Sequence, residues 1–378
     1  MILKNKRNLW LFIFVFFLLV SFQPKAEAAS TVDISAKAAI LMDEESGRVL
    51  FAENAEQRLP QASLTKIMTA LLVIENGDLH KDVVISKNAE ETGESSIWLE
   101  EGEVLSRNQL LYALMLPSAN DAAVALAESV AGSEQEFVSQ MNERARELSL
   151  KNTHFANPHG LDAEGHYSSA FDLASLTREG LEDPLFRDVV TTKEMSIPWP
   201  GHDWERALIN RNQLLNRYQG SRGVKTGYTS NAGCCLVGAA QRGDMKLITV
   251  VMNSYDMYGD TERLLNYGFD NYEMDVLEES NQTYQVKVSG GTDEIVSVKP
   301  ERQIAVAVLP DEKGQLSIKT ELVEQVEAPV KKGAVLGKGT ILLNDKKIDE
   351  INYIAQEDVA KKPPFWIAFV NWFRSLFS

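Results

Sequence analysis

Cysteine is nearly absent from this chain of 378 residues, and its two cysteines, Cys234 and Cys235, are adjacent. Neighbouring cysteines cannot build a disulfide framework, and the sequence around them lacks the spacing typical of metal ligands. We therefore expect no disulfide scaffold and no metal site at this pair. Both cysteines are interpreted as buried residues of a β-strand.

Basic residues are also few relative to acidic ones, and the formal net charge is −16. A nucleic-acid partner requires a basic surface, so this class of function is excluded. Hydrophobic residues make up 44% of the chain, which is typical of a globular protein and not of a disordered one. The length allows two or three domains with a substantial core.

The apolar run Leu9–Val20 is short for a transmembrane helix. It follows the basic residues Lys4, Lys6 and Arg7 and precedes the small-x-small sequence Ala26–Ala28. This arrangement predicts a signal peptide over residues 1–28, with a transmembrane anchor as the alternative. The protein is accordingly expected to be secreted across the cytoplasmic membrane.

The C-terminal segment 358–378 includes a second apolar stretch, Phe365–Ser378, whose polar residues fall on one narrow helical stripe. A helix of that length reaches about 21 Å, less than the ~30 Å of a bilayer core. With Trp366 and Trp372 as interfacial anchors, we expect an amphipathic helix on the outer face of the membrane. The alternative is a helix docked on the protein's own surface.

The apolar pattern between these termini predicts an α+β fold. Residues 37–54 predict a β-hairpin, and residues 223–251 predict an antiparallel meander that a helix over 261–267 follows. Most of the chain between them is helical in pattern. We expect the hairpin and the late strands to form one antiparallel sheet that packs against an all-helical block, in a domain spanning 29–275. Short β-rich runs over 276–357 predict a separate small all-β domain.

Ser63 and Lys66 open a predicted helix, residues 62–75, that is apolar on nearly every side and therefore buried. Positions i and i+3 are neighbours on a helix, so the hydroxyl and the amine could act as nucleophile and base. Burial would lower the pKa of this amine. Chance alone gives Ser-x-x-Lys about once or twice in such a chain. Ser63 could instead cap the helix while Lys66 extends to solvent.

Two further motifs favour catalysis. Ser118 and Asn120 follow a helix break at Pro117, and Lys225–Gly227 forms Lys-Thr-Gly on a predicted strand. Ser-x-x-Lys, Ser-x-Asn and Lys-Thr-Gly occur together in penicillin-binding proteins and class A β-lactamases. A second Ser-x-Asn, Ser86–Asn88, lies at a strand end outside the helical block. We prefer Ser118 because it begins a new helix that can direct side chains into a cleft.

The chain thus resembles the low-molecular-weight penicillin-binding proteins that act as D-alanyl-D-alanine carboxypeptidases. The resemblance covers the signal peptide, the penicillin-recognising domain, the small β domain and the amphipathic tail. Five flanking segments also look like those of the family: 62–69, 152–155, 158–162, 167–170 and 210–212.

The resemblance implies an α+β fold like that of β-lactamases and transpeptidases, and a serine-type hydrolase without a metal or organic cofactor. The enzyme would remove the terminal D-alanine from peptidoglycan stem peptides ending in D-Ala-D-Ala. Ser63 would be the nucleophile that forms the acyl-enzyme, and Lys66 its general base. Ser118 would relay a proton to the leaving D-alanine, and Asn120 would bind the substrate amide. β-Lactam antibiotics would acylate the same serine.

The same resemblance implies the substrate-binding residues. Lys225 and Thr226 would hold the terminal carboxylate, and Gly227 would let the substrate approach the strand closely. The backbone N–H groups of Ser63 and Tyr228 would form the oxyanion hole. Some relatives carry histidine where Tyr228 stands, a change from which we expect modest effects. Arg211 could help to bind the carboxylate or could serve only a structural ion pair. His159 could likewise shape the pocket or make only a turn hydrogen bond.

Three other functions are compatible with parts of this pattern. A class A β-lactamase would need a deacylating glutamate, and no Glu-x-x-Leu-Asn occurs between Asn120 and Lys225. A DD-transpeptidase or endopeptidase on the same scaffold stays open, because these motifs do not choose between water and an amine as acceptor. A non-catalytic penicillin-binding or wall-binding protein is disfavoured because Ser63, Lys66 and Lys225 are all present.

Overall fold

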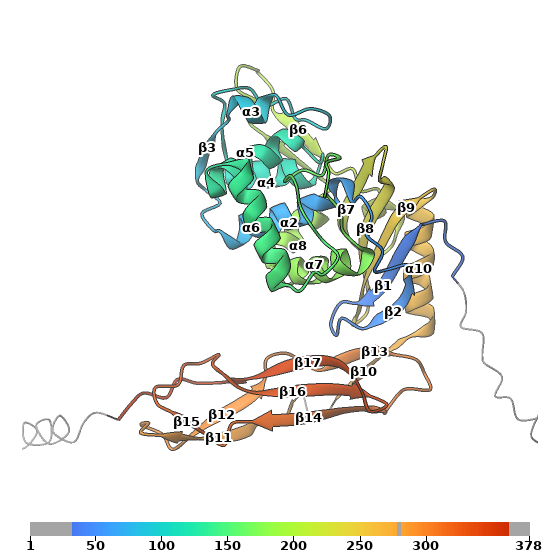
Figure 1. The fold of residues 1–378 in the computed structure, drawn as a ribbon. Coiled ribbons are helices and arrows are strands. Elements are labelled where there is room, and N and C mark those ends of the chain that lie inside the picture. The colour runs from blue at the N-terminus through green and yellow to red at the C-terminus, as the bar shows by residue number, and fades with distance from the viewer. Residues whose placement is uncertain (1–31, 278–280, 363–378) are drawn as a thin grey trace, which may run out of the picture. The chain divides into compact units, whose positions relative to one another are not determined.

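The computed structural model describes residues 32–277 and 281–362 (Figure 1). The predicted signal peptide lies outside these residues, as does the predicted tail helix from Pro363 onward. Within the two described ranges, no helix is both long enough and apolar enough to cross a bilayer.

A five-stranded antiparallel sheet organises the first domain, in the order β2-β1-β9-β8-β7. Its strands are β1 (Ala38–Asp43), β2 (Val49–Glu53), β7 (Ser221–Thr229), β8 (Gly233–Arg242) and β9 (Met245–Ser254). The first strand pairs with β9 over its whole length, with Ile40 opposite Val250. The predicted joining of the N-terminal hairpin to the late meander is therefore confirmed.

Both faces of this sheet are buried, because successive residues of β1 alternate between two apolar clusters. Ile40 and Met42 belong to the large cluster shared with the helical block. Leu41 belongs instead to a cluster that includes Leu265 of the helix α10 (Met257–Asn271). Figure 1 shows the sheet between α10 on one side and the helical block on the other.

The helical block comprises α2 (Lys66–Glu75), α3 (Lys87–Glu90), α4 (Arg107–Met115), α5 (Asn120–Ala131), α6 (Glu134–Glu147), α7 (Ala170–Glu182) and α8 (Pro184–Thr191). The helix α8 was not predicted from the sequence; it starts at Pro184 and is capped by the Asp183 carboxylate. Short additions are the hairpins β3 (Asp82–Val84) with β4 (Val104–Ser106) and β5 (Glu194–Ile197) with β6 (Arg206–Ile209), and the helix α9 (Leu214–Arg217).

The predicted helix over residues 62–75 is divided in the structure, which corrects the prediction. It begins as the 3₁₀ turn η1 (Ala62–Thr65), and the α-helix α2 starts only at Lys66. Ala62 has a φ of +48°, which an α-helix does not permit. The Thr65 hydroxyl donates to the Ala62 carbonyl at 2.9 Å and holds the turn closed. Ser63 therefore lies on a tight turn in front of a buried helix.

The C-terminal domain is all β, as predicted. Its strands are β10 (Glu273–Val276), β11 (Tyr284–Ser289), β12 (Ile295–Pro300), β13 (Ala305–Val308), β14 (Leu316–Leu322), β15 (Gln325–Glu327), β16 (Val335–Leu343) and β17 (Lys346–Ala355). Six of them form one sheet, and β10 pairs with β13. The expected boundary at residue 276 thus falls on the last residue of β10. A core that includes Val296, Val306 and Ile341 lies within this domain.

Candidate active site

Ser63 and Lys66 are in direct contact. The Lys66 Nζ lies 3.0 Å from the Ser63 Oγ, and the lysine side chain is fully buried. Because Ser63 sits on the turn η1 and Lys66 on the first position of α2, the amine reaches back over the turn to the hydroxyl. The alternative in which Lys66 extends to solvent is wrong.

The Lys66 amine has two further polar neighbours, and both are acceptors. Asn120 Oδ1 lies at 2.7 Å and the backbone carbonyl oxygen of His159 at 2.6 Å. Burial lowers the pKa of Lys66 well below its ordinary value, and the positive charges of Lys225 and Arg211 lower it further. A neutral amine has two N–H groups and one lone pair. If the two N–H groups bind the two carbonyl oxygens, the lone pair faces Ser63.

The helix break predicted at Pro117 places Ser118 and Asn120 at the same site. Ser118 has a φ of +67°, and α5 starts two residues later at Asn120. The Ser118 Oγ is buried and has no hydrogen-bond partner in the part of the chain that the structure describes. A buried hydroxyl without a partner is uncommon in folded proteins and is typical of a functional position. The second Ser-x-Asn is different, since Ser86 caps the short helix α3.

Lys225, Thr226 and Gly227 lie on β7, the edge strand of the sheet next to the turn η1. Lys225 is buried, and its Nζ donates to the Thr226 carbonyl at 3.0 Å. Burial first, and then the Arg211 guanidinium, lower the pKa of Lys225 to about 7. A Cβ added at Gly227 would lie 3.1 Å from the Ser63 backbone nitrogen. β7 therefore packs closely against the Ser63 turn at Gly227, where a side chain would require its neighbours to shift by a few tenths of an ångström.

Arg211 and Tyr228 lie at the exposed rim. Arg211 is exposed and donates to the Ser95 hydroxyl at 2.9 Å. It is near enough to lower the pKa of both Lys66 and Lys225. The Tyr228 side chain, on β7 directly after Gly227, is 66% exposed.

The loop that contains His159 contributes more than the sequence indicated. The Asn157 carboxamide oxygen accepts from the backbone N–H groups of His159 and Gly160, and the Thr69 hydroxyl donates to the Pro158 carbonyl at 2.6 Å. A Cβ on Gly160, whose φ is +96°, would lie 2.0 Å from the Ala62 carbonyl oxygen. The loop therefore packs directly on the Ser63 turn and fixes the carbonyl that binds Lys66.

The His159 side chain is neutral in this setting. Burial and then the charge of Lys66 lower its pKa to about 3. The Leu161 N–H donates to its Nδ1 at 3.2 Å, so Nε2 carries the proton. The sequence analysis considered this side chain as a pocket residue, whereas its backbone oxygen makes the contact with the amine. The sequence signal for this loop contact is Gly160, directly after His159, because glycine permits the positive φ that the loop adopts there.

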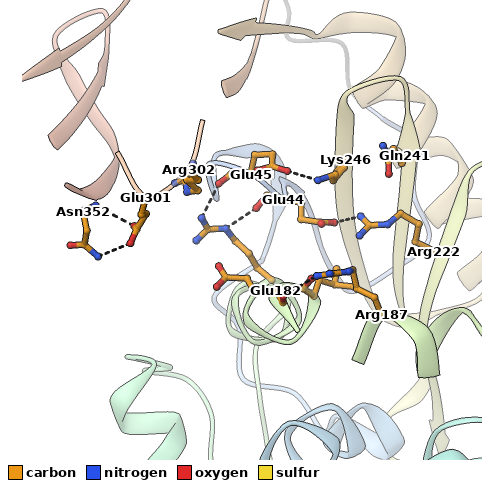
Figure 2. A pocket seen from close by; sticks show the side chains of 12 residues that line it. Glu44, Glu45, Glu182, Arg187, Arg222, Gln241, Lys246, Glu301, Arg302 and Asn352 are labelled. Atoms are coloured by element: carbon orange, nitrogen blue, oxygen red, sulfur yellow. Dashed lines mark hydrogen bonds and ion pairs between the residues drawn. The ribbon is translucent and has the colours of Figure 1, made fainter. Parts of the chain in front are cut away.

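Figure 2 shows a different pocket, lined mainly by charged side chains that include Glu44, Arg178 and Arg222. Glu44 forms an ion pair with Arg222, and Arg178 donates to the Glu44 carbonyl at 2.8 Å. None of its lining residues belongs to the site around Ser63, and they include no serine, threonine or cysteine nucleophile.

Comparison with known proteins agrees with this geometry. A family model described as "D-alanyl-D-alanine carboxypeptidase" matches residues 24–256, and one described as "Penicillin-binding protein 5, C-terminal domain" matches residues 272–361. D-alanyl-D-alanine carboxypeptidase DacF of Bacillus subtilis is 36% identical over 91% of this chain and 92% of its own length.

Two solved structures extend the comparison. Penicillin-binding protein 5 from Haemophilus influenzae has a TM-score of 0.69 and 31% identity, over 88% of this chain and all of its own. The Streptomyces K15 DD-transpeptidase has a TM-score of 0.60 and 34% identity, over 63% of this chain and 98% of its own.

The fold and the matched sequences define a serine-type hydrolase of cell-wall metabolism. The chain belongs to the D-alanyl-D-alanine carboxypeptidase family of penicillin-binding proteins. The family and the fold class expected from the sequence are both confirmed.

Proposed function

We propose that Ser63 is the nucleophile and Lys66 the general base of a penicillin-sensitive D-Ala-D-Ala carboxypeptidase. The observation that carries the proposal is the environment of the Lys66 amine. The Nζ has three oxygens within hydrogen-bond distance: the Ser63 Oγ at 3.0 Å, the Asn120 Oδ1 at 2.7 Å and the His159 carbonyl oxygen at 2.6 Å. A neutral amine can donate its two N–H groups to the two carbonyl oxygens and accept from the Ser63 hydroxyl. A lysine can act as a base near neutral pH when burial lowers its pKa.

In the acylation step, the Ser63 Oγ bonds to the carbonyl carbon of the penultimate D-alanine while its proton passes to the Lys66 Nζ. The backbone N–H groups of Ser63 and Tyr228 stabilise the negative carbonyl oxygen of the tetrahedral intermediate. Collapse of the intermediate breaks the peptide bond. The leaving amine takes a proton through the Ser118 hydroxyl, which has no hydrogen-bond partner among the described residues and is available for this transfer.

In the deacylation step, water attacks the ester and releases the shortened stem peptide, while Ser63 regains its proton. Lys66 is the base for this water as well, and no metal or organic cofactor takes part. With a β-lactam, the Ser63 Oγ attacks the ring carbonyl carbon and the ring C–N bond breaks. The leaving nitrogen stays tethered to the acyl group, and the ester with Ser63 persists.

Substrate binding is assigned to the groups around β7. The terminal carboxylate lies beside Lys225 and the Thr226 hydroxyl, with Arg211 adding positive charge from the rim. A bound carboxylate favours the charged form of Lys225 and raises its pKa above the value of about 7 in the free enzyme. Asn120 can hold the substrate amide through its Nδ2, which binds the Gly93 carbonyl at 2.9 Å in the free site.

The proposed organisation of the chain follows the sequence prediction. A signal peptide of residues 1–28 precedes the peptidase domain of 29–275, the β domain of 276–357 and a membrane-anchoring helix in 358–378. Related proteins are cell-wall enzymes, which supports a site of action outside the cytoplasm. Deletion of Pro363–Ser378 is expected to move the protein from the membrane to the soluble fraction while penicillin acylation continues. Retained membrane binding would contradict the anchor.

A transpeptidase is the second candidate, because one solved relative carries that name. The two activities share the acyl-enzyme and differ in the acceptor, water or an amine. The site residues described here are common to both.

Release of D-alanine from a diacetyl-Lys-D-Ala-D-Ala peptide tests the proposal. The wild type is expected to release D-alanine, penicillin to block the release, and Ser63→Ala to abolish both release and covalent labelling. Labelling of Ser63 without release would favour transpeptidation. Absence of both in a folded wild-type protein would overturn the assignment.

A further inference from the structure

A cluster of aromatic side chains lies outside the catalytic residues, and we call it the aromatic platform. It consists of Trp98 from the loop before β4, and of Trp199, His202 and Trp204 from the connection between β5 and β6. Trp98 is 70% exposed and Trp204 is 63% exposed. Exposed large apolar side chains gathered in one place mark binding surfaces.

The rings of the platform contact one another in series. The Trp98 and Trp199 rings are nearly parallel, at 10°, with centroids 6.4 Å apart. The His202 ring lies 4.3 Å from Trp199 and 5.0 Å from Trp204. Two chain segments far apart in sequence thus build one aromatic surface.

A buried ion pair lies against the platform. Arg206 is bound to the Glu103 carboxylate at 2.8 Å, and both side chains are almost fully buried. Its guanidinium lies 4.9 Å from the centre of the Trp199 ring and also donates to the Trp98 carbonyl at 3.4 Å. One arginine therefore fixes both tryptophans, which makes the platform a preformed surface.

The loop that carries Trp98 is also bound to the active site. The Ser95 carbonyl accepts from the Asn120 backbone N–H at 2.7 Å, and the Ser95 hydroxyl accepts from Arg211. Asp121, next to Asn120, accepts from the Ile97 N–H at 3.1 Å. Two residues of chain separate Ser95 from Trp98, so their Cα atoms are at most about 11 Å apart. A substrate that extends from Ser63 along this loop meets the platform.

The charges around the platform indicate a neutral ligand with many hydroxyl groups. The exposed carboxylates on the same two segments are Glu94, Glu100, Glu101, Asp203 and Glu205. These charges repel the anionic lipids of a membrane surface. They can instead accept hydrogen bonds from hydroxyl groups, while the electron-rich indole faces attract the polarised C–H groups of a sugar ring.

We propose that the aromatic platform binds a sugar ring of the glycan strand to which the stem peptide is joined. The proposal rests on the proposed function, since the stem peptide at Ser63 brings its glycan to this surface. The platform then favours stem peptides that are attached to glycan over free peptides of the same sequence.

The test compares two substrates in the full chain. One is a D-Ala-D-Ala stem peptide joined to an N-acetylated disaccharide of peptidoglycan, and the other is the same peptide alone. The wild type is expected to have the higher kcat/KM for the joined substrate. In Trp98→Ala and in Trp204→Ala this preference falls about fivefold to tenfold, as expected for the loss of one stacking contact. Tyr255→Ala, which removes a 94% exposed ring between β9 and α10, is the matched control and keeps the preference.

A second measurement separates this inference from the proposed function. In the full chain with Ser63→Ala, the peptide-free disaccharide is expected to shift the indole Nε1–H resonances of Trp98 and Trp204 in a saturable manner. No shift, or an unchanged substrate preference in both tryptophan variants, would overturn the platform. Loss of sedimentation with lipid vesicles in these variants, without loss of preference, would reassign it to a membrane surface. Absent D-alanine release with an intact disaccharide shift would overturn only the proposed catalysis.

Discussion

The peptidase domain and the β domain use lysine in opposite ways. Lys66 and Lys225 are 0% and 1% exposed, and neither forms an ion pair within the described residues. In the β domain, Lys338 and Lys347 lie on the surface, each 2.7 Å from the carboxylate of Glu350. Burial lowers the pKa of Lys66 and Lys225, whereas the hydrogen bond to Glu350 raises the pKa of Lys338.

The difference shows what each domain is adapted to do. An amine buried without a counter-ion destabilises the fold, because its charged form loses solvation, but it becomes a usable base. An exposed ion pair keeps its charge and contributes little to stability. The peptidase domain thus retains an unfavourable arrangement for chemistry, and the β domain has the arrangement expected where only folding matters.

The largest expected effect is on the rate of Ser63 acylation when the buried Lys66 is replaced, compared with the exposed Lys338. Lys66→Met removes the base, so the rate of Ser63 acylation by penicillin should fall about 10²- to 10⁴-fold, the usual contribution of general base catalysis. Lys338→Met makes the same chemical change on the β domain and should leave the rate unaltered. Labelling with a fluorescent penicillin gives both rates, and circular dichroism checks the fold. Acylation of Lys66→Met at more than a tenth of the wild-type rate would remove Lys66 from the role of base.

A second pair of variants compares glycines with similar backbone angles. Gly160 and Gly333 have φ values of +96° and +86°, but a Cβ on Gly160 would lie 2.0 Å from the Ala62 carbonyl oxygen, whereas nothing lies within 4 Å at Gly333. Gly333→Ala should therefore cost only the backbone strain, about 1 kcal/mol. Gly160→Ala should cost at least about 3 kcal/mol in urea unfolding and should also slow acylation, because the His159 carbonyl moves. Equal losses in the two variants would refute the packing argument.

The sequence predicted the sheet, the helical block and the β domain because their apolar periodicity is strong. It also singled out Ser63, Lys66, Ser118, Asn120 and Lys225 through residue types at fixed spacing. The structure places the Lys66 amine against Ser63 and Asn120. The pattern could not show that Ser63 lies on a 3₁₀ turn, since the difference rests on the positive φ of Ala62.

Two contributions lay beyond sequence reasoning for a physical reason. The His159 carbonyl is a backbone group, so no side-chain motif reports that it binds Lys66. The aromatic platform joins Trp98 to residues about a hundred positions later, and only the folded chain brings their rings together. The apolar pattern did not predict the hairpin of β5 and β6, whose connection contains Pro198, Pro200 and Gly201.

The pH dependence of stability sharpens the comparison at Lys225. Its pKa is about 7 in the folded protein and 10.5 in the unfolded chain, so the unfolded state binds more protons between these values. The buried Lys225 lowers the free energy of unfolding at neutral pH, and this free energy should therefore rise as pH increases from about 7 to 10.5. From pH 7.5 to 9.5, Lys66→Met, in which Lys225 titrates without Lys66, should gain about 2 kcal/mol relative to the double variant Lys66→Met/Lys225→Met. Parallel urea-unfolding curves at the two pH values would contradict the lowered pKa.

The smallest expected effect is at Glu350, whose pKa is lowered to about 2 by hydrogen bonds to Lys338 and Lys347. A lowered carboxyl pKa stabilises the fold above the unfolded value of 4.5, and this contribution is lost as pH falls through about 2. Because the group is fully exposed, salt should screen nearly all of it. Glu350→Gln should lower the urea midpoint slightly at pH 7 in low salt, and the difference should vanish at high salt or low pH. A change in the urea midpoint of Glu350→Gln as large as that of Lys225→Met would contradict this assignment. So would any loss of D-alanine release in Glu350→Gln, because the β domain is assigned no part in the chemistry.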